Sequence, residues 1–368
     1  MTEQEQENPA FLTQQLITCI GNKRALIPYI EREARAIREE LGGRRLVCAD
    51  LFAGSGVVAR MLKRHSSRLV VVDLEEYSCL VNRCYLTNES TFPHQVWQQL
   101  SDQIQRYAAS HKTEGIISQN YAPRDDAHIQ KGERVFYTRE NAVLIDTYRT
   151  LIGELVPASV QQYFLAPLVT SASVHANTSG VFKGFYKDRS GTGCFGGQGR
   201  DALHRILGKI EMVEPVLSAF DCDVQVMQGD AVTLAPSIGA VDVAYLDPPY
   251  NQHPYGSNYF MLNLIIKNRL DVPTSRVSGI TQDWRRSAFN TPKSALPSLE
   301  AVVSSVDAKF VIVSYNSEGF ISLDQMTAML TRYGRVKTVA IPYNTFRASR
   351  NLHGRDIHVK EYLFVLEK

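Results

Sequence analysis

The chain has 368 residues, 44% of them hydrophobic, which is enough for one large domain with an insertion or for two domains with separate cores. Its 40 Lys and Arg side chains against 38 Asp and Glu give a formal net charge of +2, so overall charge neither indicates nor excludes a polyanionic partner. The six cysteines form no CxxC pair, no apolar run could span a membrane, and the glutamate-rich start is unlike a signal peptide, so a cytoplasmic protein without a metal site or disulfides is expected.

Apolar runs alternate with amphipathic stretches along much of the chain, which is the pattern of an open, mostly parallel α/β sheet. The predicted strands cover residues 45–52, 68–73, 223–228, 241–246, 310–315, 336–343 and 361–366. The last two flank a polar, basic segment and are expected to pair as a terminal antiparallel hairpin. Helices are predicted at residues 23–40, 57–65, 74–86 and 323–333, the last with Ser322 as its N-cap.

The alternation of strands and helices stops between residue 87 and about residue 219. Gly, Ser and Asn are frequent from 170 to 199. We therefore expect residues 1–86 and residues 220–368 to form two parts of one α/β domain. Residues 87–219 are expected to be an insertion or a second domain.

A glycine-rich turn, Asp50-Leu-Phe-Ala-Gly54-Ser-Gly56, follows the first predicted strand. The glycines allow a tight turn and the close approach of a ligand to the start of the next helix. The following strand ends in Asp73, at the place where an acid binds ribose hydroxyls in α/β folds with a switch in strand order. The alternative is that Asp73 only caps a helix. Because no Lys follows the glycines, a ligand without phosphates is favoured.

A second turn, Asp247-Pro-Pro-Tyr250, follows another predicted strand and is expected to lie over the same crevice. Prolines have no N–H, so nearby carbonyls remain available as acceptors. The exocyclic amino group of a nucleobase is a poor nucleophile because its lone pair is delocalised into the ring. Asp247 and the Pro248 carbonyl could accept its two hydrogens and localise that lone pair. Tyr250 offers a face for a stacked base; the alternative is an ordinary turn with a buried tyrosine.

The order of these two motifs resembles that of the S-adenosylmethionine-dependent amino methyltransferases of DNA, and more narrowly the D12-class, Dam-like adenine-specific enzymes. Further stretches similar to that class cover residues 20–30, 73–78, 139–146, 177–180, 229–231 and 313–319. The resemblance implies a Rossmann-like class I methyltransferase fold, a seven-stranded mostly parallel sheet with a C-terminal β-hairpin and an inserted DNA-recognition region. It implies transfer of a methyl group from S-adenosylmethionine, leaving S-adenosylhomocysteine, to N6 of a flipped adenine in double-stranded DNA, without a metal.

Roles for individual residues follow from the two motifs and from the resemblance. The catalytic set is Asp247, Pro248, Pro249 and Tyr250. The cofactor set is Lys23, Asp50, Phe52, Ala53, Gly54, Ser55, Gly56, Asp73, Leu74, Asp230 and Asp247. Candidates for contacts with the target base or with DNA are His253, Tyr255, Asn258, Tyr259, Lys183, Lys187, Arg189, Arg347, Arg350 and Arg355. Core packing is the alternative for Tyr259, and solvated surface is the alternative for the basic residues.

Other functions use similar motifs. Cytosine-N4 methylation of DNA activates an exocyclic amino group in the same way, but its catalytic motif more often begins with Ser than with Asp. The enzymes that methylate RNA or a protein glutamine use similar turns, which usually begin with Asn. Cytosine-C5 methylation needs a cysteine nucleophile after a proline, and no Pro-Cys occurs here. A DNA-binding protein without activity would have no use for Asp247 beside a glycine loop. Double-stranded DNA is the expected partner, a cognate restriction endonuclease is a further candidate, and the enzyme is expected to be a monomer.

Overall fold

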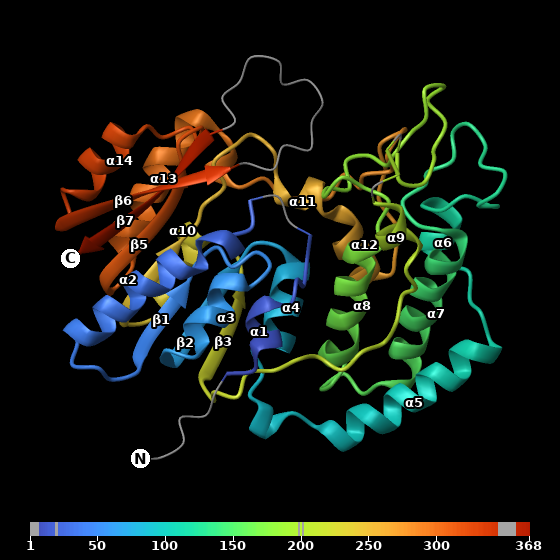
Figure 1. Ribbon diagram of the computed structural model, residues 1–368, viewed down its shortest axis with the longest axis horizontal. Coiled ribbons are helices and arrows are strands. Elements are labelled where there is room, and N and C mark those ends of the chain that lie inside the picture. The colour runs from blue at the N-terminus through green and yellow to red at the C-terminus, as the bar shows by residue number, and fades with distance from the viewer. Residues whose placement is uncertain (1–6, 19–20, 198, 201, 345–357) are drawn as a thin grey trace.

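The computed structural model describes residues 7–344 and 358–368, apart from residues 19–20, 198 and 201. The chain forms two lobes that lie side by side, one built around a β-sheet and the other made of helices (Figure 1). Arg347, Arg350 and Arg355, which the sequence suggests as DNA contacts, lie outside the described residues.

The described residues form one seven-stranded sheet with the order β3-β2-β1-β4-β5-β7-β6. The strands are β1 (Leu46–Asp50), β2 (Ser66–Asp73), β3 (Asp223–Gln228), β4 (Val241–Leu246), β5 (Ala308–Asn316), β6 (Arg335–Asn344) and β7 (His358–Glu367). All neighbours are parallel except the two pairs that β7 forms with β5 and β6. The seven predicted strands and the terminal hairpin are confirmed, and the fold is the Rossmann-like methyltransferase fold.

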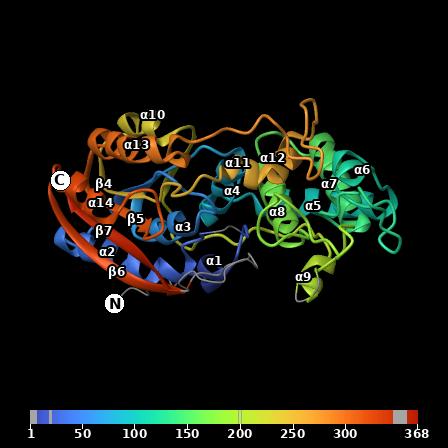
Figure 2. The same cartoon turned by 90° about the horizontal axis from the view of Figure 1, so that it is seen from above.

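Helices cover both faces of the sheet (Figure 2). One face carries α1 (Pro9–Thr13), α2 (Ile27–Glu40) and α3 (Val57–Lys63), and the other carries α10 (Ala231–Leu234), α13 (Pro292–Ser305) and α14 (Leu323–Leu330). Val243 and Tyr245 of β4 pack toward the first group, whereas Ala244 and Leu246 pack toward the second. Since both faces are covered, the strand reads as an almost continuous apolar run instead of an alternating one.

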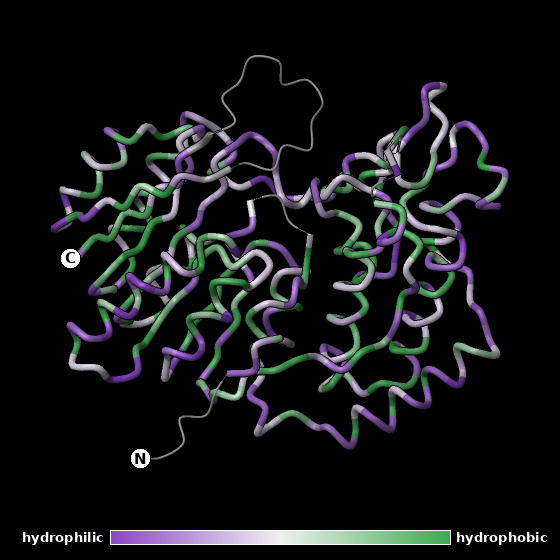
Figure 3. The backbone as a smooth tube through the Cα atoms, in the orientation of Figure 1, coloured by the Kyte–Doolittle hydropathy of each residue, from purple (hydrophilic) through white to green (hydrophobic). Residues whose placement is uncertain are grey.

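The helical lobe contains α5 (His94–Ser110), α6 (Ile116–Asn120), α7 (Arg139–Leu155), α8 (Gln162–Val174), α9 (Leu203–Leu207), α11 (Tyr255–Asn258) and α12 (Phe260–Lys267). Helix α4 (Glu76–Tyr85) lies between the sheet and this lobe, since it contacts β2 and β3 on one side and α8 on the other. Helix α8 lies at the centre of the lobe and is green along most of its length in Figure 3, since it is apolar nearly all round. The core around α8 includes Tyr77 of α4 and Phe260 of α12. The predicted insertion 87–219 therefore shares its core with segments on both sides of it in the sequence.

Helix boundaries follow local capping chemistry. Short 3-10 turns cover Arg24–Leu26, Glu89–Thr91, Ala235–Ser237 and Ala288–Asn290, and the first of these precedes α2 inside the predicted helix 23–40. Ser322 caps α14 as predicted, because its hydroxyl accepts a hydrogen bond from Gln325 N while the Gln325 side chain accepts one from Ser322 N. Helix α13 was not predicted, since Pro297 in its interior masks the helical pattern.

Gly56 begins α3 with a φ of +76°, and an added Cβ would lie 2.4 Å from Asn82 Oδ1. Gly42 has a similar φ of +84° but no atom within 4 Å of the same position. We expect Gly56→Ala to lower the free energy of unfolding more than Gly42→Ala, which carries only the cost of a left-handed alanine, about 1–2 kcal/mol. Urea unfolding of both variants, followed by circular dichroism, measures the difference. Equal losses would argue against a steric clash at Gly56.

Candidate active site

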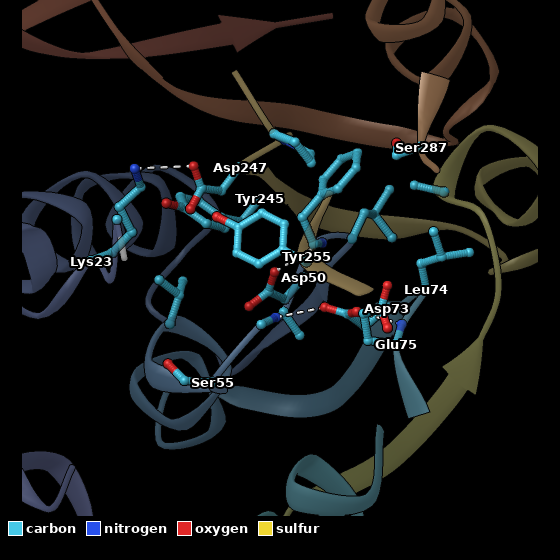
Figure 4. A pocket seen from close by; sticks show the side chains of 18 of the residues that line it. Lys23, Asp50, Ser55, Asp73, Leu74, Glu75, Tyr245, Asp247, Tyr255 and Ser287 are labelled. Atoms are coloured by element: carbon cyan, nitrogen blue, oxygen red, sulfur yellow. Dashed lines mark hydrogen bonds and ion pairs between the residues drawn. The ribbon is translucent and has the colours of Figure 1, made fainter. Parts of the chain in front are cut away.

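The candidate site is a pocket at the carboxyl ends of β1 and β4, in the middle of the sheet. The two strands are parallel and adjacent, with Asp50 opposite Tyr245. Beyond them, the glycine loop 52–56 and the turn 247–250 emerge at the same edge. Figure 4 shows Asp50 between Lys23 and Asp247 on one side of the pocket and Asp73 and Glu75 on the other. A crevice of this kind, where the order of strands reverses, is the usual ligand site of open α/β sheets.

Hydrogen bonds hold the glycine loop on both sides. The Gly54 N–H donates to Asp73 Oδ2 at 2.7 Å, and the Gly54 carbonyl accepts from the Ser78 hydroxyl at 2.7 Å. Gly54 has a φ of +53°, and nothing lies within 4 Å of the position that a Cβ would occupy. The backbone of the loop is therefore fixed while its exposed side stays open to the pocket, which is the role that the sequence predicts for the glycines.

Asp73 lines the pocket and also binds backbone groups. Besides Gly54, it accepts a hydrogen bond from Glu75 N at 2.8 Å, at the start of α4. The capping alternative is therefore part of its role, and its contact with a ribose stays a prediction. Glu75 itself lines the pocket and was not predicted, although it follows Asp73 by two residues. Burial, and then the charge of Asp73, raise the pKa of Glu75 to about 7.

Asp50 is 1% exposed and lines the floor of the pocket. Its Oδ1 accepts a hydrogen bond from Phe52 N at 3.3 Å, whereas Oδ2 has no hydrogen-bond partner among the described residues. Burial, followed by the charges of Asp247 and Asp73, raises the pKa of Asp50 to about 8. A buried oxygen without a partner carries a large desolvation cost, so this position fits a ligand that brings a hydrogen-bond donor or a positive charge.

Lys23 lies between two carboxylates next to the turn 247–250. Its Nζ is 3.1 Å from Asp247 Oδ1 and 3.6 Å from Glu361 Oε2, and it lies over the Tyr250 ring at 5.6 Å from the centroid. Burial alone lowers the pKa of Lys23, but Asp247 and Glu361 more than offset it, so the pKa lies above its ordinary value and the side chain is charged. Burial raises the pKa of Asp247 to about 6, which leaves the carboxylate ionised at neutral pH.

The aromatic residues near the turn occupy different environments. Tyr250 is partly exposed, its ring meets Tyr315 edge-on with centroids 6.3 Å apart, and its hydroxyl is close to Gly21. Tyr255 is partly exposed and lines the pocket, whereas Tyr259 is 0% exposed and packs against Tyr77 in the helical core. The structure therefore favours the core-packing alternative for Tyr259, since no part of its ring is available to a base.

A second, more open pocket lies next to the first and is rich in positive charge. Lys183 Nζ is 3.4 Å from His253 Nδ1, and Arg286 joins them in the lining beside Trp284. Burial, then the charge of Arg286, lowers the pKa of Lys183. Burial, then the charge of Lys183, lowers the pKa of His253, so its imidazole is neutral at pH 7. Two cations and this imidazole, from three separate segments, thus converge on one concavity, and we refer to Lys183, His253 and Arg286 as the cation cluster. Arg286 was not predicted, because nothing in its local sequence indicates that it meets Lys183.

The predicted residues fall into three groups. Those that line the first pocket are Lys23, Asp50, Phe52, Ala53, Gly54, Ser55, Asp73, Leu74, Asp230, Asp247, Pro249 and Tyr255. Those that border it or lie next to it are Gly56, Pro248, Tyr250, His253 and Asn258. Lys187 and Arg189 lie on an exposed loop, with Lys187 over the Phe185 ring and Arg189 in a separate hollow. Lining residues that sequence reasoning missed are Glu75, Tyr77, Tyr245, Arg285, Ser287 and Asn290.

No group of three or more His, Cys, Asp or Glu side chains in the described part of the chain could hold a metal ion. None of its described helices combines the length and the apolar composition needed to cross a membrane.

Comparison with known proteins gives relatives over nearly the whole chain. The type II methyltransferase M.NlaIII of Neisseria lactamica is 29% identical over 357 residues, which cover 95% of this chain and 98% of the relative. The type II methyltransferase M.CviAII of Paramecium bursaria Chlorella virus 1 is 30% identical over 323 residues, or 86% and 88% of the two chains. The modification methylase StsI of Streptococcus sanguinis is 26% identical, and the match covers 95% of this chain and 51% of that longer protein.

The sequence profile of the D12 class N6 adenine-specific DNA methyltransferases matches residues 20–329. The match includes the glycine loop, the turn at Asp247 and all helices of the helical lobe. The chain therefore belongs to the D12 class of N6 adenine-specific DNA methyltransferases, and it is a site-specific DNA methyltransferase that uses S-adenosylmethionine.

Proposed function

We propose that this protein transfers a methyl group from S-adenosylmethionine to the exocyclic N6 of an adenine that it flips out of a specific double-stranded DNA sequence. The observation that carries this proposal is the position of the Asp247 carboxylate. It lines the same pocket as the glycine loop, yet it lies on the turn that leads to Tyr250 and to the cation cluster. A group placed between a cofactor pocket and a cationic surface can act on a base that arrives from that surface.

The first pocket fits S-adenosylmethionine. Its acidic residues are Asp50, Asp73, Glu75, Asp230 and Asp247. The cofactor carries an ammonium and a sulfonium, so it offers positive charge to carboxylates whose pKa values are raised by burial. The unpartnered Asp50 Oδ2 would accept from one of its donors, and Asp73 beside Leu74 would face the ribose and the adenine. When bound, the cofactor supplies the electrophilic methyl group.

Asp247 and the Pro248 carbonyl would polarise the target amino group. The carboxylate is ionised above a pH of about 6 and can accept one amino hydrogen. Proline supplies no competing N–H, so the carbonyl of the turn can accept the other. Two acceptors on one nitrogen localise its lone pair and make it nucleophilic toward the methyl group. Lys23, bound to Asp247 Oδ1, would fix the orientation of the carboxylate.

The target adenine must leave the duplex to reach this position, at a cost of a few kcal/mol for unstacking. Tyr250 would stack on the flipped base, which contributes roughly 1–3 kcal/mol. Tyr255 lines the wall of the pocket between the two sites. His253 and Asn258 would border the base. Contacts with the DNA backbone must offset the rest of the unstacking cost.

The cation cluster would bind the phosphates next to the flipped adenine. Lys183 and His253 approach each other to 3.4 Å and share their concavity with Arg286, an arrangement that a phosphate would stabilise. Lys187 and Arg189 would extend this contact along the exposed loop of the helical lobe. We propose residues 87–219 as the main DNA-recognition region, with residues 1–86 and 220–368 as the two parts of the catalytic domain. A monomer acting in the cytoplasm, alongside a cognate restriction endonuclease, would suffice.

The catalytic proposal predicts that Asp247→Asn lowers methyl transfer by ~100- to 10,000-fold, the usual contribution of a positioned acid or base. The wild-type rate should fall as the pH drops through about 6, because protonation removes the acceptor. The assay incubates protein, labelled S-adenosylmethionine and unmethylated DNA and identifies methylated nucleosides by mass spectrometry. Asp271→Asn, at an exposed carboxylate, is the control. N4-methylcytosine as the product would reject adenine as the target, and an active Asp247→Asn would reject the role of Asp247.

The cofactor proposal predicts that Asp73→Ala raises the Kd for S-adenosylmethionine by about 10- to 100-fold, the equivalent of one hydrogen bond to a charged group. The loss also frees the Gly54 N–H from its partner, so the loop itself is loosened. Isothermal titration calorimetry measures the Kd. Asp223→Ala, at an exposed residue at the opposite end of the sheet, should bind normally. An unchanged Kd would restrict Asp73 to capping α4.

The DNA-contact proposal predicts that Arg286→Gln and Lys183→Gln each weaken DNA binding and reduce the slope of log K against log salt by about 1, as expected for one lost phosphate contact. Fluorescence anisotropy at several salt concentrations measures the slope. Arg106→Gln, on the exposed surface of α5, should change neither the affinity nor the slope. Slopes equal to the wild-type value would assign the cluster to solvated surface.

A further inference from the structure

Glu361 on β7 is a buried acid that the proposed chemistry does not use. It is 3% exposed, and its Oε1 accepts a hydrogen bond from Asn316 Nδ2 at 3.0 Å. Asn316 is its partner in the antiparallel pairing of β5 with β7, so the sheet framework itself fixes the carboxylate. Glu361 Oε2 accepts no hydrogen bond from the described residues, and the Lys23 ammonium faces it at 3.6 Å.

Lys23 is thus shared between a carboxylate in the pocket and a carboxylate in the sheet. The ammonium and both acids are buried or nearly so, with side-chain exposures of 3% for Lys23, 4% for Glu361 and 19% for Asp247. One cation between two anions leaves a net negative charge, which is costly in a site removed from water. A residue that served only to bury Lys23 would not need to be charged, since Asp247 alone would neutralise it.

The second acid changes how Asp247 behaves. If the Lys23 ammonium were paired with Asp247 alone, it would neutralise that carboxylate more fully and make it a weaker hydrogen-bond acceptor. Because Lys23 is also paired with Glu361, it neutralises Asp247 less, and the negative charge of Glu361 lies close to Asp247 as well. The pKa of Asp247 reflects this balance, because burial raises it first, Lys23 lowers it and Glu361 raises it again. The other titratable groups around Asp247 and Lys23 are Asp50 on β1, Tyr245 on β4 and Tyr250 in the turn.

We propose that Glu361 is a positioning residue of the methyl-transfer reaction, which anchors Lys23 from the sheet and thereby keeps the Asp247 carboxylate both oriented and strongly accepting. This inference rests on the proposed function, because it assumes that Asp247 accepts a hydrogen from the target amino group. Glu361 itself lies behind Lys23 and need not touch the cofactor or the base.

The test compares Glu361→Gln with Glu367→Gln. Glu367 lies on the same strand but is more exposed, and its carboxylate pairs with Arg335 on the surface. Glu361→Gln should fold, because the Lys23–Asp247 pair that remains is neutral. We expect its single-turnover rate of methyl transfer to fall by about tenfold, since a weaker acceptor supports less of the acid–base contribution. The acid limb of its pH–rate profile should move to lower pH, because the charge that raises the pKa of Asp247 is gone. Glu367→Gln should leave the rate and the profile unchanged.

Glu361→Asp provides a second, graded measurement. Its carboxylate stays charged but lies about one bond length further from Lys23. The rate of this variant, and the pH of its acid limb, should therefore be intermediate between the values for the wild type and for Glu361→Gln. If Glu361→Gln does not fold, Glu361→Asp alone decides the question, and an unchanged rate and acid limb would overturn the inference. A loss of stability without a shift of the acid limb would also overturn it, because a purely structural role gives that result.

The outcome can be separated from the fate of the proposed function. If wild-type protein and Glu367→Gln both form N6-methyladenine while Glu361→Gln matches them in rate and pH profile, the inference fails and the function stands. If the wild type forms no N6-methyladenine, the function fails first. Thermal unfolding and S-adenosylmethionine binding, measured for every variant, confirm that each protein compared is folded and binds its cofactor.

Discussion

Strands β1 and β4 are neighbours in the middle of the sheet, with β2 on the far side of β1 and β5 on the far side of β4. The chain therefore leaves these two strands in opposite directions across the sheet. This reversal leaves a crevice at their carboxyl ends, which is the usual ligand site of such sheets. The glycine loop and the Asp247 turn meet there, although they are far apart in the sequence. The positions of the first pocket and of Asp247 beside it both follow from this one feature of the strand order.

Acidic side chains are concentrated in that crevice, and burial makes their ionised forms costly. Asp50, Glu75 and Asp247 all have raised pKa values, and burial is the main cause in each case. A protein stores such a cost only where a ligand or a neighbouring cation relieves it. Lys23 relieves it at Asp247, and a cationic cofactor would relieve it at Asp50. The same carboxylates that destabilise the empty pocket can thus select for a positively charged ligand.

The helical lobe places a second kind of surface beside this acidic crevice. Helices α11 and α12 join the lobe to the turn 247–250, since they follow it in the sequence and α12 packs against α8. Lys183 from the lobe meets His253, which lies between this turn and α11. An acidic pocket and a basic concavity are thereby neighbours, with Tyr255 in the lining of the first. Movement of the lobe relative to the sheet would alter both surfaces together.

Local patterns in the sequence were sufficient for the seven strands, for four of the helices and for the two loops, but not for the helices of residues 87–219 or for α13. Strands buried on both faces give apolar runs, the left-handed turn at Gly56 requires glycine, and the Ser322 cap needs only its neighbour Gln325. These features depend on interactions between residues a few positions apart, which the sequence displays directly. The family expected for the chain also came from the sequence, because the glycine loop and the Asp247 turn occur together and in a fixed order.

The tertiary structure alone decided which remote residues meet. Glu361 reads as one more polar position at the start of an apolar strand until the antiparallel insertion of β7 beside β5 brings it to Lys23. Arg286 carries no signal that it lies beside Lys183, and Tyr259 looks like its neighbour Tyr255 until packing buries it completely. Periodicity records which face of an element is apolar, but it contains no information on which distant element covers that face. Strand order and helix packing supply that information, and they depend on the whole chain.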